Sequence, residues 1–256
     1  MKTARILFVF AWILMLAALL FTPLMTIFGD LLAQGQANRT VEQYSANLLA
    51  TFAAHHRQYV AAAQIPVCAK EGIVSVEDKR FYQDAGIDPI AVVRVLLMST
   101  VNDHVDHGGS TLTQQLARII IREPRAAPNM LVAAASLLHI FRYALIVNHD
   151  FSKQKILELY LNSVYFGKHA TGIAQAAQAY FHTSLDTLTL GQCLYLTGLP
   201  QAPSIFGQNP QGVIATDRYR HVLTTMVRNH YLTETQAAAL AQENLFAKNA
   251  SQHVLH

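Results

Sequence analysis

The stretch EDKRFYQDAGID, from Glu77 to Asp88, carries the clearest chemistry in the chain. It opens with two adjacent carboxylates, and Phe81 follows about one helical turn later. Consecutive side chains on a helix point about 100° apart, so Glu77 and Asp78 would face different surroundings. Burial beside an aromatic ring disfavours the charged form of a carboxylate, which suits a general acid or base. Taken alone, the stretch is more simply interpreted as the solvated, acidic start of a helix.

Helix signals continue on the C-terminal side of this stretch. Asp88 followed by Pro89 predicts the N-cap and first residue of a helix. Capping boxes are indicated at Thr189 with Gln192 and at Thr233 with Gln236. There are no internal repeats and almost no strand-like alternation, so the sequence predicts a mostly α fold. Further helices are expected over residues 110–122, 130–147, 153–162 and 172–180, and another is expected to end at residues 198–200.

The composition limits the classes of partner. Of 256 residues, 52% are hydrophobic and only 14% are charged, which is apolar for a soluble protein. The net charge of +3 suits an anionic membrane surface or an anionic substrate. This basic excess is too diffuse to indicate nucleic acid, and the chain carries no DNA- or RNA-binding signature.

Residues 6–28 form an apolar run that predicts a transmembrane anchor. At 1.5 Å per residue the run spans roughly 30 Å, the thickness of one hydrocarbon core. Lys2 and Arg5 precede it, which places the N-terminus in the cytoplasm and the rest of the chain outside. The alternative is a cleaved signal peptide. The run is long for a signal-peptide core and no clean cleavage site follows, so we expect an uncleaved anchor.

Two groups of residues leave alternatives open. An extracytoplasmic location would allow Cys68 and Cys193 to form a disulfide but does not require it. Two buried free thiols agree with the sequence equally well. His104 and His107 lie in a glycine-ended loop where a metal site is conceivable, although solvated loop residues are the simpler interpretation.

Four sequence blocks stand out in this order: EDKRFYQDAG at 77–86, GSTLTQQL at 109–116, ILELYLNSVYFG at 156–167 and GLPQAPS at 198–204. Together they resemble the peptidoglycan glycosyltransferase family (glycosyltransferase family 51), which forms the front domain of class A penicillin-binding proteins and the monofunctional cell-wall transglycosylases. The likeness covers about residues 65–241. No penicillin-binding transpeptidase pattern follows, so we expect the monofunctional form.

This resemblance implies a lysozyme-like α lobe and a smaller jaw lobe that touches the membrane. It also implies a single-pass protein of the bacterial inner membrane, with its catalytic domain on the extracytoplasmic side. The expected organisation is a cytoplasmic tip and transmembrane helix at 1–29, a juxtamembrane linker and helix at 30–64, a glycosyltransferase-like domain at 65–247 with its jaw at about 98–130, and a tail at 248–256.

The reaction implied by the resemblance is polymerisation of lipid II into glycan strands, with inversion at the anomeric carbon. Glu77 would be the general base that takes the proton of the acceptor 4-hydroxyl, and Arg118, in the place of a family lysine, would hold the pyrophosphate.

The expected partners are lipid II, the growing glycan strand, the membrane and other cell-wall synthesis or division proteins; a divalent cation could accompany the pyrophosphate. The expected substrate-binding residues are Asp78, Phe81, Gly109, Ser110, Thr111, Gln114, Gln115, Arg118 and Arg142.

The chain departs from the family pattern most in the third motif, which brings an Arg-Lys pair and a second glutamate. Counting back from Ser152, these positions fall on Ser136, Leu137 and Ile140. Preorganised donors of this kind are worth about 3–4 kcal/mol each, by analogy with oxyanion holes. Arg142 or His139 would be the replacement cation. Smaller departures are Asp84 for a histidine, His169 for a glycine and Gln192 for a glutamate.

Three hypotheses follow from this pattern. The first is an active, divergent peptidoglycan glycosyltransferase, favoured because the blocks around Glu77 and Gln114-Gln115 are intact. The second is a catalytically impaired member that binds lipid II or the cell-wall machinery. The third is a membrane-anchored lytic muramidase that uses Glu77 in a lysozyme-like cleft.

Overall fold

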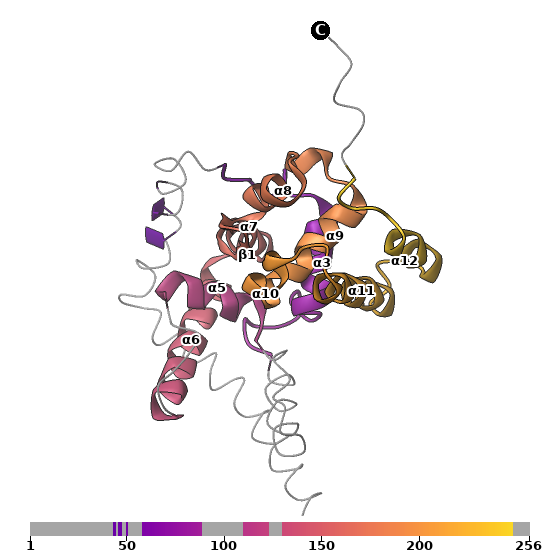
Figure 1. Cartoon of the computed structure of the whole chain (residues 1–256). Coiled ribbons are helices and arrows are strands. Elements are labelled where there is room, and N and C mark those ends of the chain that lie inside the picture. Colours follow the sequence, from indigo (N-terminus) through magenta and orange to yellow (C-terminus); the bar gives the residue numbers. More distant parts are fainter. Residues whose placement is uncertain are drawn as a thin grey trace, which may run out of the picture. The chain divides into compact units, whose positions relative to one another are not determined.

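The computed structural model describes residues 58–88, 110–122 and 130–247, together with residues 43, 44, 46, 47 and 50 (Figure 1). This part of the chain is mostly helical, as the sequence predicts. The expected anchor at 6–28, the histidine-containing loop and the tail lie outside the described residues. Among the helices that are described, none has the length and apolar character needed to cross a bilayer.

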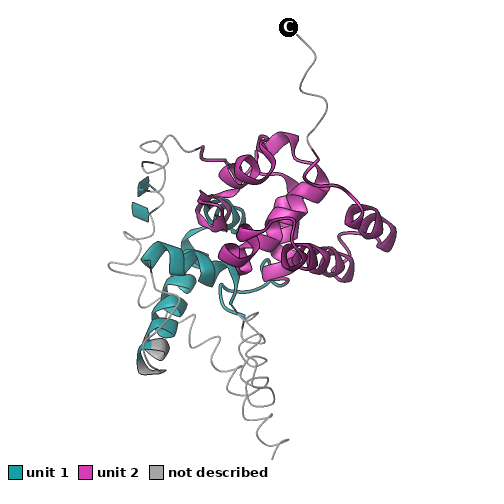
Figure 2. Ribbon diagram, viewed as in Figure 1, with its two compact units in different colours: residues 1–55, 80–160 teal, residues 56–79, 161–256 magenta. Residues whose placement is uncertain are grey.

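The chain divides into two compact units, each built from two segments (Figure 2). Unit 1 comprises Met1–His55 and Arg80–Tyr160, and unit 2 comprises His56–Lys79 and Leu161–His256. Helix α7 (Lys153–Ser163) begins in unit 1 and ends in unit 2.

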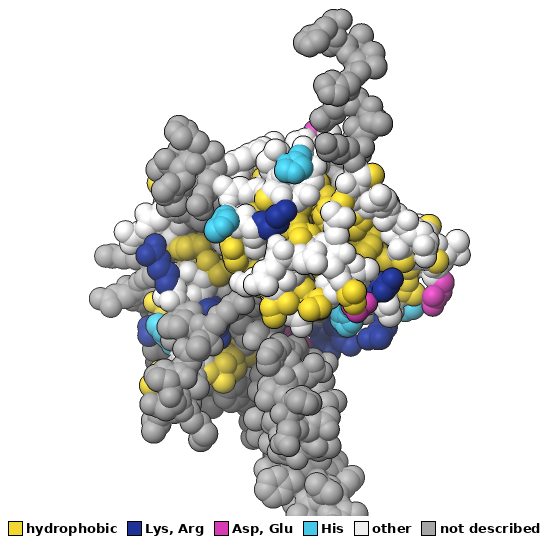
Figure 3. Space-filling model, in the orientation of Figure 1, with side chains coloured by type: hydrophobic (Ala, Val, Ile, Leu, Met, Phe, Trp, Pro, Cys, Tyr) yellow, Lys and Arg dark blue, Asp and Glu magenta, His cyan; other side chains and the backbone are white. Residues whose placement is uncertain are grey.

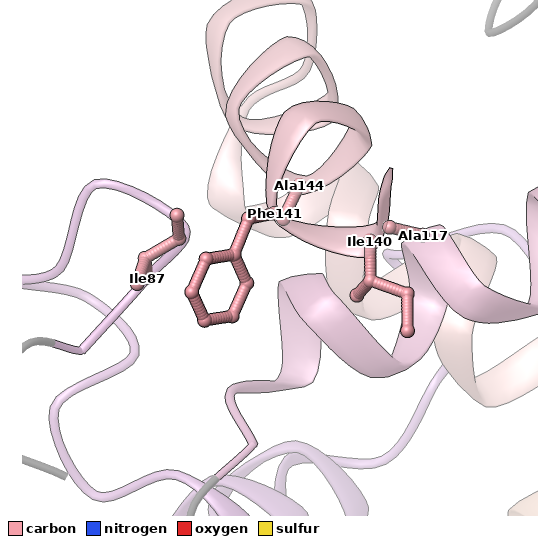
Figure 4. Packing of buried hydrophobic residues seen from close by; sticks show 5 residues of the cluster. All are labelled: Ile87, Ala117, Ile140, Phe141 and Ala144. Atoms are coloured by element: carbon pink, nitrogen blue, oxygen red, sulfur yellow. The ribbon is translucent and has the colours of Figure 1, made fainter. Parts of the chain in front are cut away.

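Unit 1 contains helix α5 (Leu112–Ile121) packed against helix α6 (Met130–Asp150). Leu112, Leu116 and Ile120 recur every four residues on α5 and are buried, which gives that helix one apolar face. A small core joins the two helices to the loop that contains Ile87, near the end of the stretch Glu77–Asp88 (Figure 4). It consists of Ile87 from the loop, Ala117 from α5, and Ile140, Phe141 and Ala144 from α6.

Unit 2 is arranged around helix α9 (Leu190–Gly198), in which every residue from Gly191 to Gly198 is buried. Helices α3, α8, α11 and α12 all pack against it. The elements of this unit besides α9 are α3 (Val67–Glu77), β1 (Tyr165–Gly167), β2 (Ala170–Thr171), α8 (Ile173–Phe181), the 3₁₀ turns η2 (Leu185–Thr187) and η3 (Leu199–Gln201), α10 (Pro203–Gln208), α11 (Val213–Arg228) and α12 (Glu234–Ala241).

Helices α3 and α9 approach each other closely and are covalently linked. A disulfide joins Cys68 to Cys193, which resolves the alternative left open by the sequence. One helical turn further along α3, a Cβ added at Gly72 would lie 2.8 Å from Thr197 Cγ2. Glycine is therefore required at this position, because any side chain would push the two helices apart.

The predicted capping boxes are present on both α9 and α12. A third box, at Thr111 with Gln114, begins α5. The hairpin formed by β1 and β2 was not predicted; in it, Tyr165 pairs with Thr171 and Gly167 with Ala170.

Apolar side chains also lie on the surface of unit 2. The face in Figure 3 shows hydrophobic and uncharged side chains over much of this unit, with few charged ones. Ile205 on α10, and Val213 and Ile214 at the start of α11, are exposed. These three side chains therefore lie outside the apolar core that surrounds α9.

Candidate active site

Glu77 is the last residue of α3, and Asp78 is its C-cap. The expectation that this acidic pair starts a helix is therefore wrong. The backbone leaves the helical conformation at Asp78 (φ −155°, ψ 76°), while its N–H still donates to Val74 O at 3.0 Å. Since the helix ends here, Phe81 does not lie one helical turn beyond Glu77 on the same face. The carboxylate of Glu77 instead projects from a helix terminus.

Arg218, on α11, is a partner of Glu77 within unit 2. Its terminal nitrogen donates to Glu77 Oε1 at 3.2 Å, and its Nε donates to the carbonyl of Gly198 at 2.8 Å. The two side chains are only 10% and 12% exposed. Burial lowers the pKa of the Arg218 guanidinium, and the Glu77 carboxylate opposes that shift.

Sequence reasoning missed Arg218, although a signal was present. The buried residues Ala215, Tyr219 and Val222 form the apolar stripe of α11. Arg218 lies three residues after the first and four before the last, so it falls on this stripe. An arginine on an apolar helix face needs a partner, because an unpaired buried charge is strongly destabilising.

The helix that carries Glu77 is held at several points along its length. The disulfide anchors its first turn, and Gly72 allows close contact with α9. Near its end, Asn229 Nδ2 donates to Ser75 O at 3.1 Å and to Ser75 Oγ at 2.9 Å. These contacts fix the backbone from which the Glu77 side chain extends.

The second block of candidate residues lies at the start of α5 in unit 1. Ser110 is exposed, whereas Thr111 and Gln114 are buried. Thr111 Oγ1 donates to Gly86 O at 2.7 Å and accepts from Gln114 N at 3.1 Å, while Gln114 Oε1 accepts from Thr111 N at 2.9 Å. Gln114 Nε2 is buried and has no hydrogen-bond partner among the described residues.

Two further residues of this block, Gln115 and Arg118, lie on α5 itself. Gln115 Oε1 accepts a hydrogen bond from the Tyr160 hydroxyl at 2.9 Å, which ties α5 to α7 within unit 1. Arg118 is half-buried in the last turn of α5. Gly109, also expected here, lies outside the described residues.

Phe81 and Asp84 are joined through Lys153 at the start of α7. Phe81 is fully buried, and the Lys153 ammonium lies 4.6 Å from the centre of its ring. The same ammonium is 3.0 Å from Asp84 Oδ1, which also accepts from Gly86 N at 2.7 Å. Asp84 thus takes part in an ion pair at a position where the family pattern has a histidine.

Asp88, which was predicted to cap a helix, forms an ion pair with Arg80. Its carboxylate accepts from Arg80 Nε at 2.8 Å. The helix that it was expected to cap lies outside the described residues.

The third-motif positions lie on α6. Leu137 is exposed and Ser136 is half-buried. Ile140 is 2% exposed and belongs to the core shared with α5 (Figure 4). Arg142, the candidate replacement cation, is exposed, and His139 contacts Tyr143 edge-on with their rings 5.0 Å apart. The position expected to carry a second carboxylate is thus a packed apolar site.

The structure therefore describes the candidate residues in two groups. Glu77 and Asp78 belong to unit 2, together with Arg218. Among the residues with described coordinates, no group of three or more His, Cys, Asp or Glu is placed to hold a metal ion. The candidates in unit 1 are Phe81, Ser110, Thr111, Gln114, Gln115, Arg118 and Arg142.

Comparison with known proteins identifies similar sequences over most of the chain. The sequence model of the family described as Transglycosylase matches residues 45–227. Penicillin-binding protein 1A of Escherichia coli K12 is 34% identical over 212 residues, which cover 82% of this chain and 24% of that protein. Penicillin-binding protein 1A of Vibrio cholerae is 33% identical over 215 residues, covering 84% of this chain and 25% of that protein.

A solved structure is also similar over a shorter region. The crystal structure of penicillin-binding protein 1A from Haemophilus influenzae is 39% identical, covers 37% of this chain and 14% of that chain, and has a TM-score of 0.33. The chain spans about a quarter of the length of the curated relatives it matches.

Proposed function

The chain belongs to the transglycosylase family, glycosyltransferase family 51, and from this premise we propose that it is a peptidoglycan glycosyltransferase. In the proposed reaction, the 4-hydroxyl of the acceptor GlcNAc attacks C1 of the donor MurNAc. A new O–C1 bond forms with inversion, and the bond from C1 to the phosphate oxygen breaks. The electron pair of that bond leaves with undecaprenyl pyrophosphate, and the hydroxyl proton passes to Glu77.

The observation that carries this proposal is the placement of the Glu77 carboxylate. It extends from the terminus of a helix that is fixed to α9, and it is held by Arg218 while remaining 12% exposed. A sugar hydroxyl is a weak nucleophile, and one positioned base contributes roughly 10²–10⁴ in rate. A carboxylate that is ordered and still accessible meets this requirement.

We assign the substrate contacts to the residues that the family pattern indicates. Ser110, Thr111 and Gln114 stand at the N-terminus of α5, where helix N–H groups favour a phosphate. Gln114 Nε2 supports this assignment, because a buried donor without a partner is stabilised when a ligand accepts from it. The other proposed substrate contacts are Asp78, Phe81, Gly109, Gln115, Arg118 and Arg142.

The proposed setting is the outer face of the bacterial inner membrane, with residues 1–29 as a single-pass anchor and residues 65–247 as a lysozyme-like lobe with a membrane-touching jaw. The Cys68–Cys193 disulfide supports the location, because such bonds persist in oxidising compartments. Lipid II and the growing strand are the proposed partners, together with other cell-wall proteins.

A second candidate function is binding of lipid II without catalysis. The burial of Ile140 in the α5–α6 core favours it, because the third motif's carboxylate cannot be replaced from that position. Ser136 and Leu137 supply no cation for the leaving pyrophosphate, and this leaves the role to Arg142 or Arg118.

The test is a lipid II polymerisation assay on the detergent-solubilised full chain beside Glu77→Gln. We expect glycan strands from the wild type and none from the folded variant. Equal activity of the two proteins would refute Glu77 as the base. If neither makes strands but both bind moenomycin, a family inhibitor that mimics the donor, the binding function replaces the catalytic one.

A further inference from the structure

We propose that Arg218 is a positioning residue for Glu77, and that it acts by tying the Glu77 carboxylate to the carbonyl of Gly198 at the end of α9. The inference rests on the proposed role of Glu77 as the base. All three residues belong to unit 2.

The guanidinium makes two hydrogen bonds in different directions. Its Nε donates to Gly198 O at 2.8 Å, and a terminal nitrogen donates to Glu77 Oε1 at 3.2 Å. The planar fork of arginine holds its donors in a fixed relation, so fixing one bond restricts where the other can point. The carbonyl of Gly198 therefore sets the direction from which Arg218 reaches Glu77.

The region where Arg218 meets Gly198 is tightly packed. A Cβ added at Gly198 would lie 2.9 Å from Val222 Cγ2 and 3.2 Å from Arg218 Cγ. Glycine thus allows α11 to come close enough for Arg218 to lie against the end of α9. Because the Arg218 side chain is only 10% exposed, its conformation is restricted by the surrounding residues.

The contacts described above for α3 hold its backbone, whereas the contact with Arg218 is made by the Glu77 carboxylate itself. The disulfide, the Gly72 contact and the Asn229–Ser75 hydrogen bonds fix the helix axis. A glutamate side chain at a helix end retains rotational freedom about its own bonds. The ion pair with Arg218 restricts that freedom.

A stability role alone is a weaker explanation of this pair. Burying two charges costs desolvation energy that their attraction often only balances. A base, by contrast, depends on placement, and misplacing a reacting group by 1 Å costs about 10² in rate. Arg220 gives a matched comparison, because it lies on the same helix and pairs with Asp217 at 3.1 Å while 62% exposed.

The experiment compares the detergent-solubilised full chain with Arg218→Gln, Arg218→Lys, Arg220→Gln and Glu77→Gln. Each protein is assayed for kcat and KM with lipid II, and its thermal unfolding is recorded. We expect Arg218→Gln to lower kcat about 10- to 100-fold and to change KM by less than about threefold, since the lost interaction acts in the transition state. Arg218→Lys keeps the charge but not the fork, so its kcat should fall between those of wild type and Arg218→Gln. Arg220→Gln should behave as wild type.

The outcomes separate this inference from the proposed function. Wild-type kcat in Arg218→Gln, with Glu77→Gln inactive, overturns the role of Arg218 and leaves the base in place. An active Glu77→Gln, or a wild type that makes no strands, overturns the proposed function and the inference with it. If Arg218→Gln does not fold, Arg218→Lys decides: a folded protein with wild-type kcat refutes the need for the fork, and reduced kcat at unchanged KM supports it.

Discussion

At residue 192 the chain carries a glutamine where the family pattern has a glutamate, and the structure explains what the amide contributes. Gln192 Oε1 accepts from Thr189 N at 3.1 Å, as either residue could. Its Nε2 donates to Leu245 O at 2.9 Å, which only the amide can do. The segment after α12 is thereby attached to the start of α9, where Glu243 also accepts from Thr189 Oγ1 at 2.6 Å.

The substitution Gln192→Glu should therefore destabilise the protein. It removes a buried donor, leaves Leu245 O facing a carboxylate and adds a negative charge near Glu243. We expect the free energy of unfolding, measured in denaturant, to fall by about 1–3 kcal/mol. Gln236→Glu is the control, because Gln236 occupies the same capping-box position on α12 but is exposed; it should be nearly neutral. Equal losses in both variants would argue against this role of the Gln192 amide.

At the scale of single residues, the sequence predicted local chemistry better than tertiary contacts. The capping boxes at Thr189 and Thr233 were predictable because each depends on residues three apart. The sequence did not predict that a helix ends at Glu77. Acidic residues are typical of helix starts, and no glycine marks this helix end. The role of Arg218 depends on Glu77, 141 residues away, which no local pattern reveals.

The contact between α3 and α9 determines the position of the helix that bears Glu77. Gly72→Ala should place a methyl group 2.8 Å from Thr197 Cγ2, where Thr197 is fully buried and cannot withdraw. Overpacking of this kind costs about 1–3 kcal/mol, more than the ~1 kcal/mol that alanine gains over glycine within a helix. We expect a lower melting temperature for Gly72→Ala. Adding Thr197→Ala should recover part of the loss if the two side chains compete for one space; strict additivity would contradict this.

Unit 2 also contains a row of buried tyrosines on α8, α9 and α11. The rings of Tyr180 and Tyr195 lie 6.1 Å apart, and those of Tyr195 and Tyr219 lie 6.0 Å apart. Their hydroxyls donate to the backbone carbonyls of Phe166, Pro210 and Leu240, respectively. Burial raises the pKa of Tyr180 to about 12 and raises the pKa values of Tyr195 and Tyr219 as well.

These shifts predict alkaline instability. A phenol whose pKa is higher in the folded chain contributes stability that is complete below the unfolded value of about 10 and is lost as pH rises through the folded value. The free energy of unfolding should thus decline between about pH 10 and pH 12, the window set by Tyr180. Tyr180→Phe should flatten the decline while lowering stability at pH 8, since its hydrogen bond to Phe166 is lost. An unchanged slope would exclude Tyr180 as a source.

Several predicted elements followed the sequence closely, whereas α10, α11 and the β1–β2 hairpin were not predicted and α3 ends, rather than begins, at Glu77. The run at 153–162 became α7, and the run at 172–180 became α8, shifted by one residue. The hairpin between them was missed because its turn residues, Lys168 and His169, adopt positive φ angles of 50° and 60° without being glycine. Turn signals in sequence rest on glycine and asparagine, and neither residue occupies these two positions.

At the scale of the whole molecule, one covalent bond spans much of the chain. The Cys68–Cys193 disulfide closes a loop with a sequence separation of 125 residues, which restricts the unfolded chain by about 4–5 kcal/mol in the chain-entropy model. Cys68→Ala with Cys193→Ala should lower the free energy of unfolding by a similar amount. Wild type measured with a reducing agent should match the double variant. If reduction lowers the stability of the double variant too, the reagent acts elsewhere.

The division of unit 2 into two separate segments has a consequence for synthesis on the ribosome. Glu77 is made in the first segment, and Arg218 is added only 141 residues later, after all of Arg80–Tyr160. A nascent chain that has not reached Arg218 carries the Glu77 carboxylate without this cationic partner. Translation order alone thus delays assembly of the group proposed to do the chemistry until nearly the whole of the described chain has been made.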